Sequence, residues 1–275
     1  MVVKMKTRYL RVSEHLVLAE HRIKVAAIKL AAKLGWKKYR EMTDGPTTIM
    51  TNDRIPRRFV RLYSGPEEAA IRSWMQRKPG ASYLDVGAGS GRFAKMALEN
   101  GACNVTAVDI ADSCVSALNA ISGIRALKMD ARKLDFPDSS FDRVMMLGNA
   151  LANTYLPLWY GGEHDNQLQI LRELYRVTRS EVCLTLQRPE SMRIVLQYYR
   201  MNHLELYEYD HKIGIKRLHV FDESGTKSEF RSHHFREQDV DSILQEAGIL
   251  ISQYSIIPIN HCNWLVIIRK GGGEE

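Results

Sequence analysis

The chain has 275 residues, of which 45% are hydrophobic, and a formal net charge of +7 at neutral pH. These values support a full hydrophobic core, and the length suits one α/β domain of typical size plus an extension. No apolar run approaches the roughly 20 residues that a membrane span needs. The first residues lack the apolar stretch of a secretory signal, so we expect a cytoplasmic protein. The four cysteines are scattered without a Cys-x-x-Cys pair, which argues against a zinc site and a disulfide framework.

Charge is distributed unevenly along the chain. Residues 1–80 carry 18 Lys and Arg against 7 Asp and Glu, whereas the remaining 195 residues carry 21 against 25. The basic character therefore belongs to the N-terminal part. We predict a basic helical extension or lid over residues 1–75, one α/β domain over residues 76–270, and a disordered tail over residues 271–275.

The extension begins with a predicted helix. Ser13 is suited to be its N-cap, Gly35 follows its last apolar residue, and the apolar residues between them recur at helical spacing. Lys and Arg residues lie off this apolar stripe. The basic face fits three roles: the solvated side of a packed helix, an arm in residues 1–61 that contacts the phosphates of RNA or anionic metabolites, or a helix on a membrane surface.

A second helix is predicted over residues 66–75, directly ahead of the first strand. It has proline at its first position, where the missing backbone N–H costs nothing, and two acidic residues in its first turn. It ends before Pro79 and Gly80.

The most informative feature is a glycine-rich loop that follows the first strand. Residues 84–91 read Leu-Asp-Val-Gly-Ala-Gly-Ser-Gly, and a good helix follows over residues 92–99. A strand, a tight glycine turn and a helix N-terminus together form a nucleotide cradle. The spacing Gly87-x-Gly89-x-Gly91 is one residue shorter than the dinucleotide fingerprint G-x-G-x-x-G requires.

Acidic residues follow the next two predicted strands. The apolar, β-branched run 105–109 ends at Asp109. A carboxylate at this position can accept hydrogen bonds from both hydroxyls of a ribose. The run 124–129 leads to Asp130, whose carboxylate could accept a hydrogen bond from an exocyclic adenine amine. Residues 141–147 are predicted to form a fourth strand, entered from a Pro-Asp-Ser-Ser turn.

This succession of motifs resembles class I S-adenosylmethionine-dependent methyltransferases. The matching residues are 84–91, 108–109, 130–131 and 135–144, and the resemblance runs from about residue 83 to residue 185, and more loosely to residue 269. Three acidic residues at three successive strand ends are specific for this family, whereas a lone glycine loop is weak evidence. The resemblance implies S-adenosylmethionine as the cofactor and a doubly wound α/β fold. We expect a seven-stranded, mostly parallel sheet with an antiparallel last strand.

The resemblance also implies roles for individual residues. Asp85 and the glycine loop would hold the methionine half of the cofactor, Asp109 the ribose and Asp130 the adenine. In related enzymes the segment before the first strand often folds over the cofactor, so Arg58 and Tyr63 are candidates to contact it, although they could equally be a surface charge and a packing aromatic. The predicted cofactor-binding residues are Arg58, Tyr63, Asp85, Gly87, Ala88, Gly89, Ser90, Gly91, Asp109, Ile110, Asp130, Ala131, Leu147, Gly148 and Asn149.

The acceptor side should follow the fourth strand, at the carboxyl ends of the strands. The chain lacks the Asn-Pro-Pro-Tyr or Asp-Pro-Pro-Tyr signature with which similar enzymes grip the planar amino group of a base, which disfavours a DNA base as acceptor. Residues 148–153 instead resemble the corresponding stretch of glycine N-methyltransferase and related small-molecule enzymes. Those enzymes usually carry Gly-Asn-Ser there and a His where this chain has Asn153. The candidate catalytic residues are Asn149, Tyr155 and His164; for Tyr155 the alternative is core packing, and for His164 a helix start.

The last third of the chain is predicted to complete the sheet. The predicted elements are a fifth strand over 181–186, a mostly helical segment over 191–207, a β-hairpin insertion formed by 213–220 and 227–235, a helix over 237–247, and a final antiparallel pair formed by 249–257 and 264–269.

We expect an enzyme that transfers a methyl group to an N or O atom of a small molecule. The alternatives are methylation of RNA guided by the basic extension, and a scaffold protein that binds the cofactor without turnover. A nicotinamide-dependent dehydrogenase is the nearest rival among doubly wound nucleotide binders. Methyl transfer is an in-line displacement from an excellent leaving group, so orientation supplies much of the rate and a base is needed only when the acceptor must lose a proton. The sequence predicts no metal ion and leaves the oligomeric state open.

Overall fold

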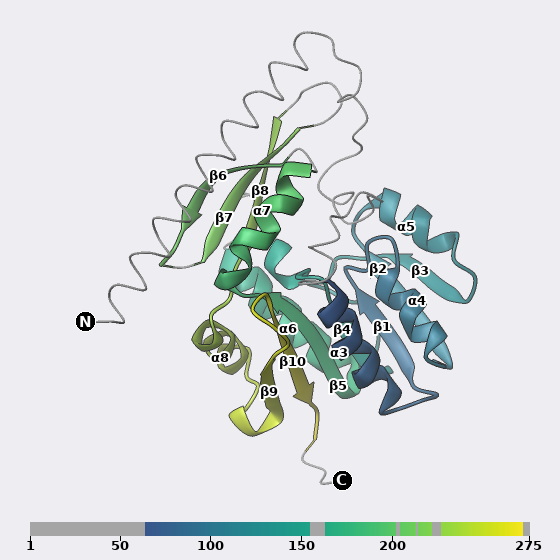
Figure 1. The fold of residues 1–275 in the computed structure, drawn as a ribbon. Helices are drawn as coiled ribbons and strands as arrows, with labels where there is room; N and C mark the ends of the chain where they lie inside the picture. Colours follow the sequence, from purple (N-terminus) through teal and green to yellow (C-terminus); the bar gives the residue numbers. More distant parts are fainter. Residues whose placement is uncertain (1–63, 155–162, 202–203, 213, 222–226, 272–275) are drawn as a thin grey trace.

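The computed structural model describes residues 64–154, 163–201, 204–212, 214–221 and 227–271, and its elements are shown in Figure 1. Strands and helices alternate through the first part of the described chain, as a doubly wound fold requires. The helices are α3 (Gly65–Gln76), α4 (Arg92–Glu99), α5 (Asp112–Asn119), α6 (Glu163–Val177), α7 (Met192–Met201) and α8 (Glu237–Glu246). The strands are β1 (Ser82–Val86), β2 (Asn104–Asp109), β3 (Ile124–Lys128), β4 (Phe141–Met146), β5 (Thr178–Gln187), β6 (Leu204–Asp210), β7 (Ile215–Phe221), β8 (Lys227–His233), β9 (Tyr254–Pro258) and β10 (Asn263–Arg269).

Seven strands form one sheet in the order β3-β2-β1-β4-β5-β10-β9. The pairs from β3 to β5 are parallel, and β10 is antiparallel to both of its neighbours. The predicted seven-stranded, mostly parallel sheet with an antiparallel last strand is therefore confirmed. The chain runs outward from β1 to β3 and then returns to β4, so the strand order reverses between β1 and β4. In open α/β sheets, ligands bind at the carboxyl ends of the strands beside this switch point.

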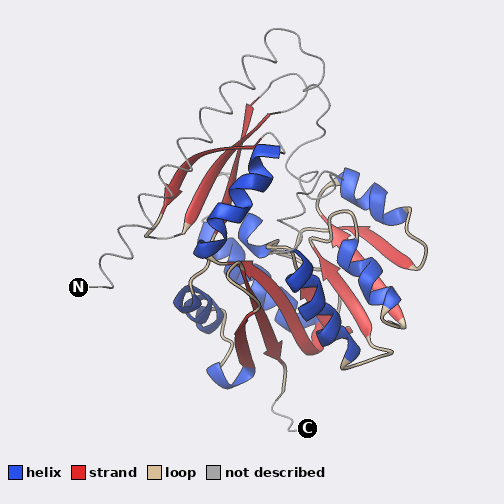
Figure 2. Ribbon diagram, viewed as in Figure 1, coloured by secondary structure: helices blue, strands red, loops and turns tan. Residues whose placement is uncertain are grey.

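Helices cover both faces of this sheet (Figure 2), and alternate residues of each strand point to opposite faces. On β4, Val144 and Met146 pack in the cluster that contains the buried residues of α6 and α8. Met145 packs in the other cluster, with the buried residues of α3 and α4. Asp85 lies on the same side of β1 as Tyr83, a member of the α3 and α4 cluster.

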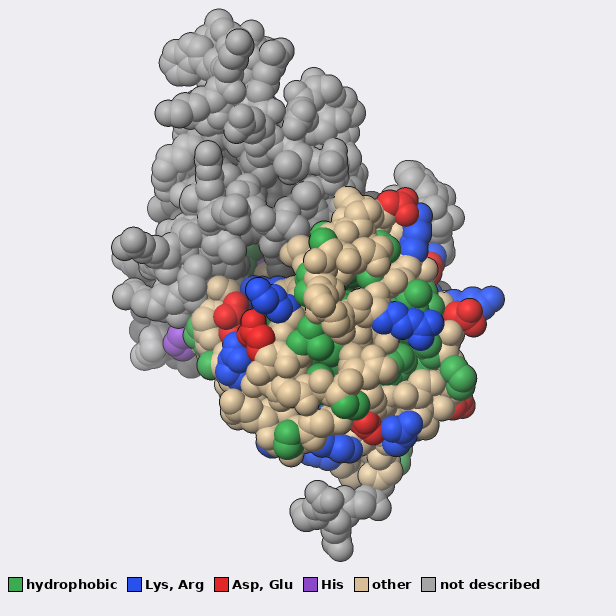
Figure 3. Space-filling model, turned by 90° about the vertical axis from the view of Figure 1, so that its right-hand side faces the viewer, with side chains coloured by type: hydrophobic (Ala, Val, Ile, Leu, Met, Phe, Trp, Pro, Cys, Tyr) green, Lys and Arg blue, Asp and Glu red, His purple; other side chains and the backbone are tan. Residues whose placement is uncertain are grey.

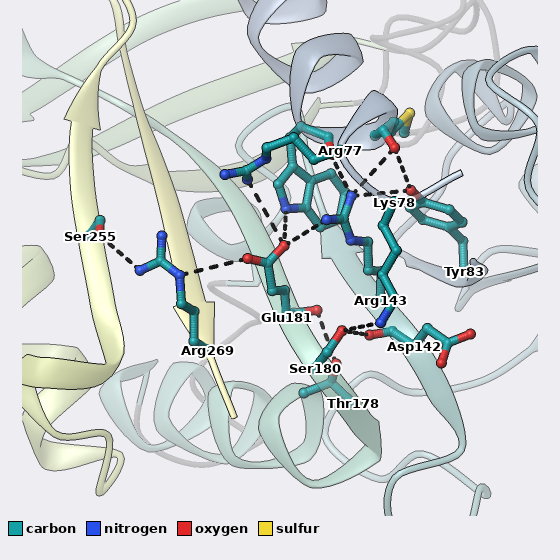
Figure 4. Close-up of polar contacts among 12 residues, drawn as sticks. Arg77, Lys78, Tyr83, Asp142, Arg143, Thr178, Ser180, Glu181, Ser255 and Arg269 are labelled. Carbon is teal, nitrogen blue, oxygen red and sulfur yellow. Dashed lines mark hydrogen bonds and ion pairs between the residues drawn. The ribbon is translucent and has the colours of Figure 1, made fainter. Parts of the chain in front are cut away.

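Helix α3 is part of this core. Ile71, Trp74 and Met75 are at most 2% exposed. At the amino ends of the strands, the Trp74 indole donates to Glu181 Oε2 over 2.8 Å, and the Arg143 guanidinium lies 3.0 Å from the same oxygen (Figure 4). These contacts join the C-terminal half of α3 to β4 and β5. The boundary at residue 75 between extension and domain stays a prediction, since residues 1–63 lie outside the described ranges.

The predicted insertion is a three-stranded antiparallel sheet, in the order β6-β7-β8. The hairpin prediction for β7 and β8 is confirmed, but the helix predicted through residue 207 is wrong after Met201, because β6 occupies Leu204–Asp210. Residues 204–210 read Leu-Glu-Leu-Tyr-Glu-Tyr-Asp, in which apolar and acidic residues alternate, with one shift of phase between Leu206 and Tyr207 where the pairing of β6 is irregular. The strand predicted from residue 249 begins only at Tyr254. No helix in the described ranges has both the length and the apolar character that a membrane span needs.

Candidate functional site

The glycine loop between β1 and α4 is folded over the end of β2. The backbone N–H groups of Gly87 and Ala88 donate to the carbonyl oxygen of Val108 over 2.9 and 3.1 Å. The N–H of Gly89 donates to the Asp109 carboxylate over 2.9 Å. Gly89 has a φ of +57°, and a Cβ added there would meet no atom within 4 Å. The loop is thus held at its base, and open space lies beside Gly89.

The turn after β4 lies against this loop. A Cβ added at Gly87 would stand 3.3 Å from the Cβ of Ala150. Ala150 N donates to the carbonyl oxygen of Leu147, and the two central residues, Gly148 and Asn149, have φ angles of 64° and 65°. These features define a type I′ turn, whose central positions favour glycine and asparagine.

The side chain of Asn149 is directed into the scaffold. It is 3% exposed, its Oδ1 accepts from the Gln187 backbone N–H over 2.8 Å, and its Nδ2 donates to Ser232 Oγ over 3.4 Å. Both ends of the amide therefore connect the turn to β5 and β8. A direct catalytic role of Asn149 stays a prediction.

Asp85 near the end of β1 is the most unusual titratable group beside the loop. It is 1% exposed, and its Oδ2 has no hydrogen-bond partner among the described residues. The pKa of Asp85 is raised to about 8, mainly by burial and also by the nearby Asp109 carboxylate, while the Ala94 backbone N–H and Arg92 lower it. A buried carboxyl oxygen without a donor is a group that a cationic or hydrogen-bonding ligand would satisfy.

Asp109 and Ile110 occupy the end of β2. The Asp109 carboxylate accepts from the backbone N–H groups of Gly89 and Ala111 over 2.9 and 3.0 Å, and the residue is 8% exposed. Ile110 is a large hydrophobic side chain that is 53% exposed. An acid beside an exposed aliphatic group suits a nucleoside, which presents hydroxyls and an apolar ring face.

Asp130, after β3, is held by a neighbouring cation. Both of its carboxylate oxygens accept from the Arg132 guanidinium, which lowers the pKa of Asp130. Arg132 also donates to Asn166 of α6 over 3.3 Å. Ala131 packs beside it against the α6 and α8 cluster. An adenine contact would have to share this carboxylate with Arg132.

Of the remaining predicted site residues, some lie in the described part of the chain and others do not. Leu147 is 4% exposed within the turn, and Ser90 is half-buried in the glycine loop. His164 lies in the first turn of α6. Tyr155, Arg58 and Tyr63 lie outside the described residues.

Sequence reasoning missed one buried connection beside the loop. Glu67 of α3 forms a 2.6 Å ion pair with Arg92, the first residue of α4, and accepts a 2.7 Å hydrogen bond from the Thr185 hydroxyl of β5. Acidic residues in the first turn of a helix already have a local explanation, which is the helix dipole. Glu67 and Thr185 are 118 positions apart in the sequence, so no local pattern indicates their contact.

Comparisons with known proteins agree with this geometry. A family profile described as a methyltransferase domain matches residues 84–185. Among solved structures, the PH0226 protein of Pyrococcus horikoshii OT3 is 17% identical, with a TM-score of 0.55 over 82% of this chain and 96% of its own. The CcbJ methyltransferase of Streptomyces caelestis is 14% identical, with a TM-score of 0.55 over 80% and 98%. CalS10 of Micromonospora echinaspora is 15% identical, with a TM-score of 0.50 over 80% and 99%. At these identities the structures show a shared fold; no curated protein matches the chain.

The sheet order, the switch point and the glycine loop define a doubly wound, nucleotide-binding α/β protein of the Rossmann-like type. Residues 84–185 match the methyltransferase domain profile, so this part of the chain is a methyltransferase domain, and the fold around it is the one shared with the methyltransferases CcbJ and CalS10. The unsatisfied oxygen of Asp85, the space beside Gly89 and the exposed Ile110 fit S-adenosylmethionine as the cofactor.

Proposed function

We propose that this methyltransferase acts on an N or O atom of a small molecule. The observation that carries the proposal is the turn after β4. Its Asn149 amide is already bound to Gln187 and Ser232, so it is not available to grip the planar amine of a base. The sequence there also lacks the Asn-Pro-Pro-Tyr signature of base-methylating enzymes.

The insertion sheet supports the same acceptor class. Ser232 of β8 donates to Asn153 Oδ1 over 2.8 Å, which brings the insertion to the carboxyl edge of the main sheet, beside the turn after β4. An added sheet at this edge would enclose a compact acceptor. CalS10, one of the proteins with this fold, is described as an amino pentose methyltransferase. An amino pentose belongs to the class of small-molecule acceptors proposed here.

In this proposal the cofactor is held by residues at four strand ends. Asp85 and the glycine loop hold its methionine half, Asp109 its ribose, Ile110 and Asp130 its adenine, and the turn from Leu147 closes the site. The bound cofactor supplies a methyl group on a sulfonium, which is an excellent leaving group. The protein's own contribution is to orient the acceptor in line and to exclude water. Tyr155 and His164 remain candidates to accept a proton where the acceptor must lose one.

The test is a screen of the full-length chain with labelled S-adenosylmethionine, in separate reactions with metabolite fractions and with total RNA. We expect label in a small-molecule product and none in RNA. An Asp109→Ala variant, assayed in parallel, controls for labelling that does not depend on the proposed cofactor site. Cofactor binding without label in any fraction would favour the scaffold alternative. Calorimetric titrations with S-adenosylhomocysteine and with NAD would distinguish a methyltransferase, which binds the first ligand, from a dehydrogenase, which binds the second.

RNA methylation is the second candidate, because residues 1–80 carry 18 basic against 7 acidic residues. A protein that neutralises phosphates releases counterions, so RNA binding would weaken steeply as salt is raised. A full-length variant with Lys33, Lys37 and Lys38 changed to Gln should then lose RNA labelling. Unchanged activity of this variant on a small-molecule acceptor would support our proposal.

A further inference from the structure

Glu67, in the first turn of α3, connects two loops that are far apart in the sequence. Its side chain is 1% exposed, and each carboxylate oxygen has a different partner. Oε2 lies 2.6 Å from the Arg92 guanidinium, and Oε1 accepts from the Thr185 hydroxyl over 2.7 Å. Charge-assisted hydrogen bonds of this length are about twice as strong as neutral ones.

The link through Thr185 reaches the turn after β4. A hydroxyl carries one proton and two acceptor lone pairs. Because the Thr185 proton is donated to Glu67, its oxygen can accept from the Gly148 N–H, at 2.7 Å. The Thr185 carbonyl also accepts from the Asn149 N–H, at 3.1 Å. Thr185 therefore binds both left-handed residues of the turn, and Glu67 sets the direction of its hydroxyl.

The link through Arg92 reaches the end of the glycine loop. Arg92 follows Gly91 directly and begins α4, so its guanidinium fixes the point at which the loop becomes a helix. The guanidinium also lies 4.1 Å from the centre of the Phe93 ring. The ion pair with Glu67 thus ties the glycine loop to α3, and α3 to β5.

We infer that Glu67 is a positioning residue for the methionine half of the cofactor. It holds the glycine loop and the turn after β4 in one arrangement, so that the site is formed before the ligand arrives and less ordering is needed on binding. This inference rests on the cofactor placement given under the proposed function. The adenosine half is placed at the ends of β2 and β3, and among the described contacts neither Arg92 nor Thr185 forms a hydrogen bond with Asp109 or Asp130.

The chain offers a matched control residue, Glu181, which binds the other end of the same helix. The Glu181 carboxylate is half-buried and also binds α3, through Trp74, but it lies at the amino ends of the strands. Glu181→Gln should lower the thermal midpoint without changing the affinity for any cofactor analogue. Glu67→Gln should lower the affinity for analogues that carry the amino acid.

The experiment measures two dissociation constants for each full-length protein by calorimetry. The ligands are S-adenosylhomocysteine, which carries the amino acid, and 5′-methylthioadenosine, which lacks it. We expect Glu67→Gln and Thr185→Val to weaken binding of S-adenosylhomocysteine about tenfold, as expected when a hydrogen bond to a charged group is lost, and to leave binding of 5′-methylthioadenosine unchanged. Thr185→Ser, which keeps the hydroxyl, should bind both ligands as the wild type does.

The double variant should be no worse than either single variant, because both changes break the same connection. Equal loss for both ligands, or no loss for either, would overturn the positioning role while leaving the cofactor placement intact. Failure of the wild type to bind S-adenosylhomocysteine would overturn the placement itself, and the inference with it.

Discussion

At the scale of single residues, Asp85 is a group that the fold alone does not favour. Its burial raises the pKa to about 8, and only the Ala94 N–H and Arg92 oppose this. A buried polar group that lacks a partner costs stability, and such costs persist where function requires them. Asp85 is therefore the residue at which stability and cofactor binding should conflict most clearly.

The first prediction concerns the pH dependence of stability. In the folded chain Asp85 stays protonated up to about pH 8, whereas in the unfolded chain it loses its proton near 3.8. Between these values the native state holds the extra proton, so this group makes the unfolding free energy fall as pH rises. Asp85→Asn should flatten that fall in urea titrations across the window and weaken binding of S-adenosylhomocysteine. Parallel pH profiles for variant and wild type would contradict the assignment.

The second prediction concerns Asp109. Asp109→Ala removes the acceptor for the proposed ribose contact and for the Gly89 N–H, so binding of S-adenosylhomocysteine should weaken by about 1–3 kcal/mol. Asp112→Ala is the control, because its exposed carboxylate pairs only with Lys128 among the contacts described. Unchanged calorimetric affinity in Asp109→Ala would show that the ribose lies elsewhere.

At the scale of elements, the glycine loop divides into a structural and a functional part. Gly91 is the N-cap residue just before α4, has a left-handed φ of +88°, and lies close to Leu118 of α5. Gly89, two residues earlier, faces open space. Two glycines of one motif are thus required for different physical reasons.

The third prediction separates these reasons. A Cβ in Gly91→Ala would stand 2.7 Å from Ile121 and 2.9 Å from Leu118, so with the backbone strain we expect a loss of about 2–4 kcal/mol in unfolding free energy. Gly89→Ala should lose only about 1–2 kcal/mol, from the left-handed backbone alone, but should bind the cofactor more weakly. Gly101→Ala, also left-handed with free space, should lose stability without losing affinity. Wild-type affinity in Gly89→Ala would contradict this division.

The sequence predicted the elements well wherever one periodicity dominated. The runs that became β1, β2 and β4 are buried parallel strands, and the loop spacing predicted a nucleotide site at their carboxyl ends. The helix prediction was wrong for residues 204–210, which form a strand. These residues follow a correctly predicted helix and contain tyrosines, and their alternating pattern is short. The contact from Glu67 to Thr185 could not be predicted, since it depends on which strand of the folded sheet α3 packs against.

At the scale of the whole molecule, two sheets meet at one edge. Lys216 of β7 is fully buried and donates to Gln187 Oε1 of β5 over 2.6 Å, and burial lowers its pKa. Ser232 of β8 bonds with Asn149 and Asn153 beside it. The described part of the face in Figure 3 mixes Lys and Arg side chains with Asp and Glu side chains, rather than presenting one sign of charge.

The fourth prediction tests this junction. Ser232→Ala removes the hydrogen bonds to Asn149 and Asn153. Because Thr185 still holds the backbone of Gly148 and Asn149, the change loosens the insertion and leaves the turn after β4 in place. It should therefore raise the KM for the acceptor and leave the affinity for S-adenosylhomocysteine unchanged. Steady-state kinetics with the acceptor found in the screen, together with calorimetry, measure both. A change in cofactor affinity alone would place the junction on the other side of the site.

The position of β10 also governs when this protein can fold. β10 is the last strand of the described residues in chain order, yet it lies inside the sheet, between β5 and β9. During synthesis, β5 therefore keeps one edge unpaired, and the apolar side chains of β10 are missing from both faces, until residues 263–269 have left the ribosome. Unpaired strand edges are sites of aggregation. A nascent chain stalled before residue 263 should accordingly depend on chaperones far more than the finished enzyme does.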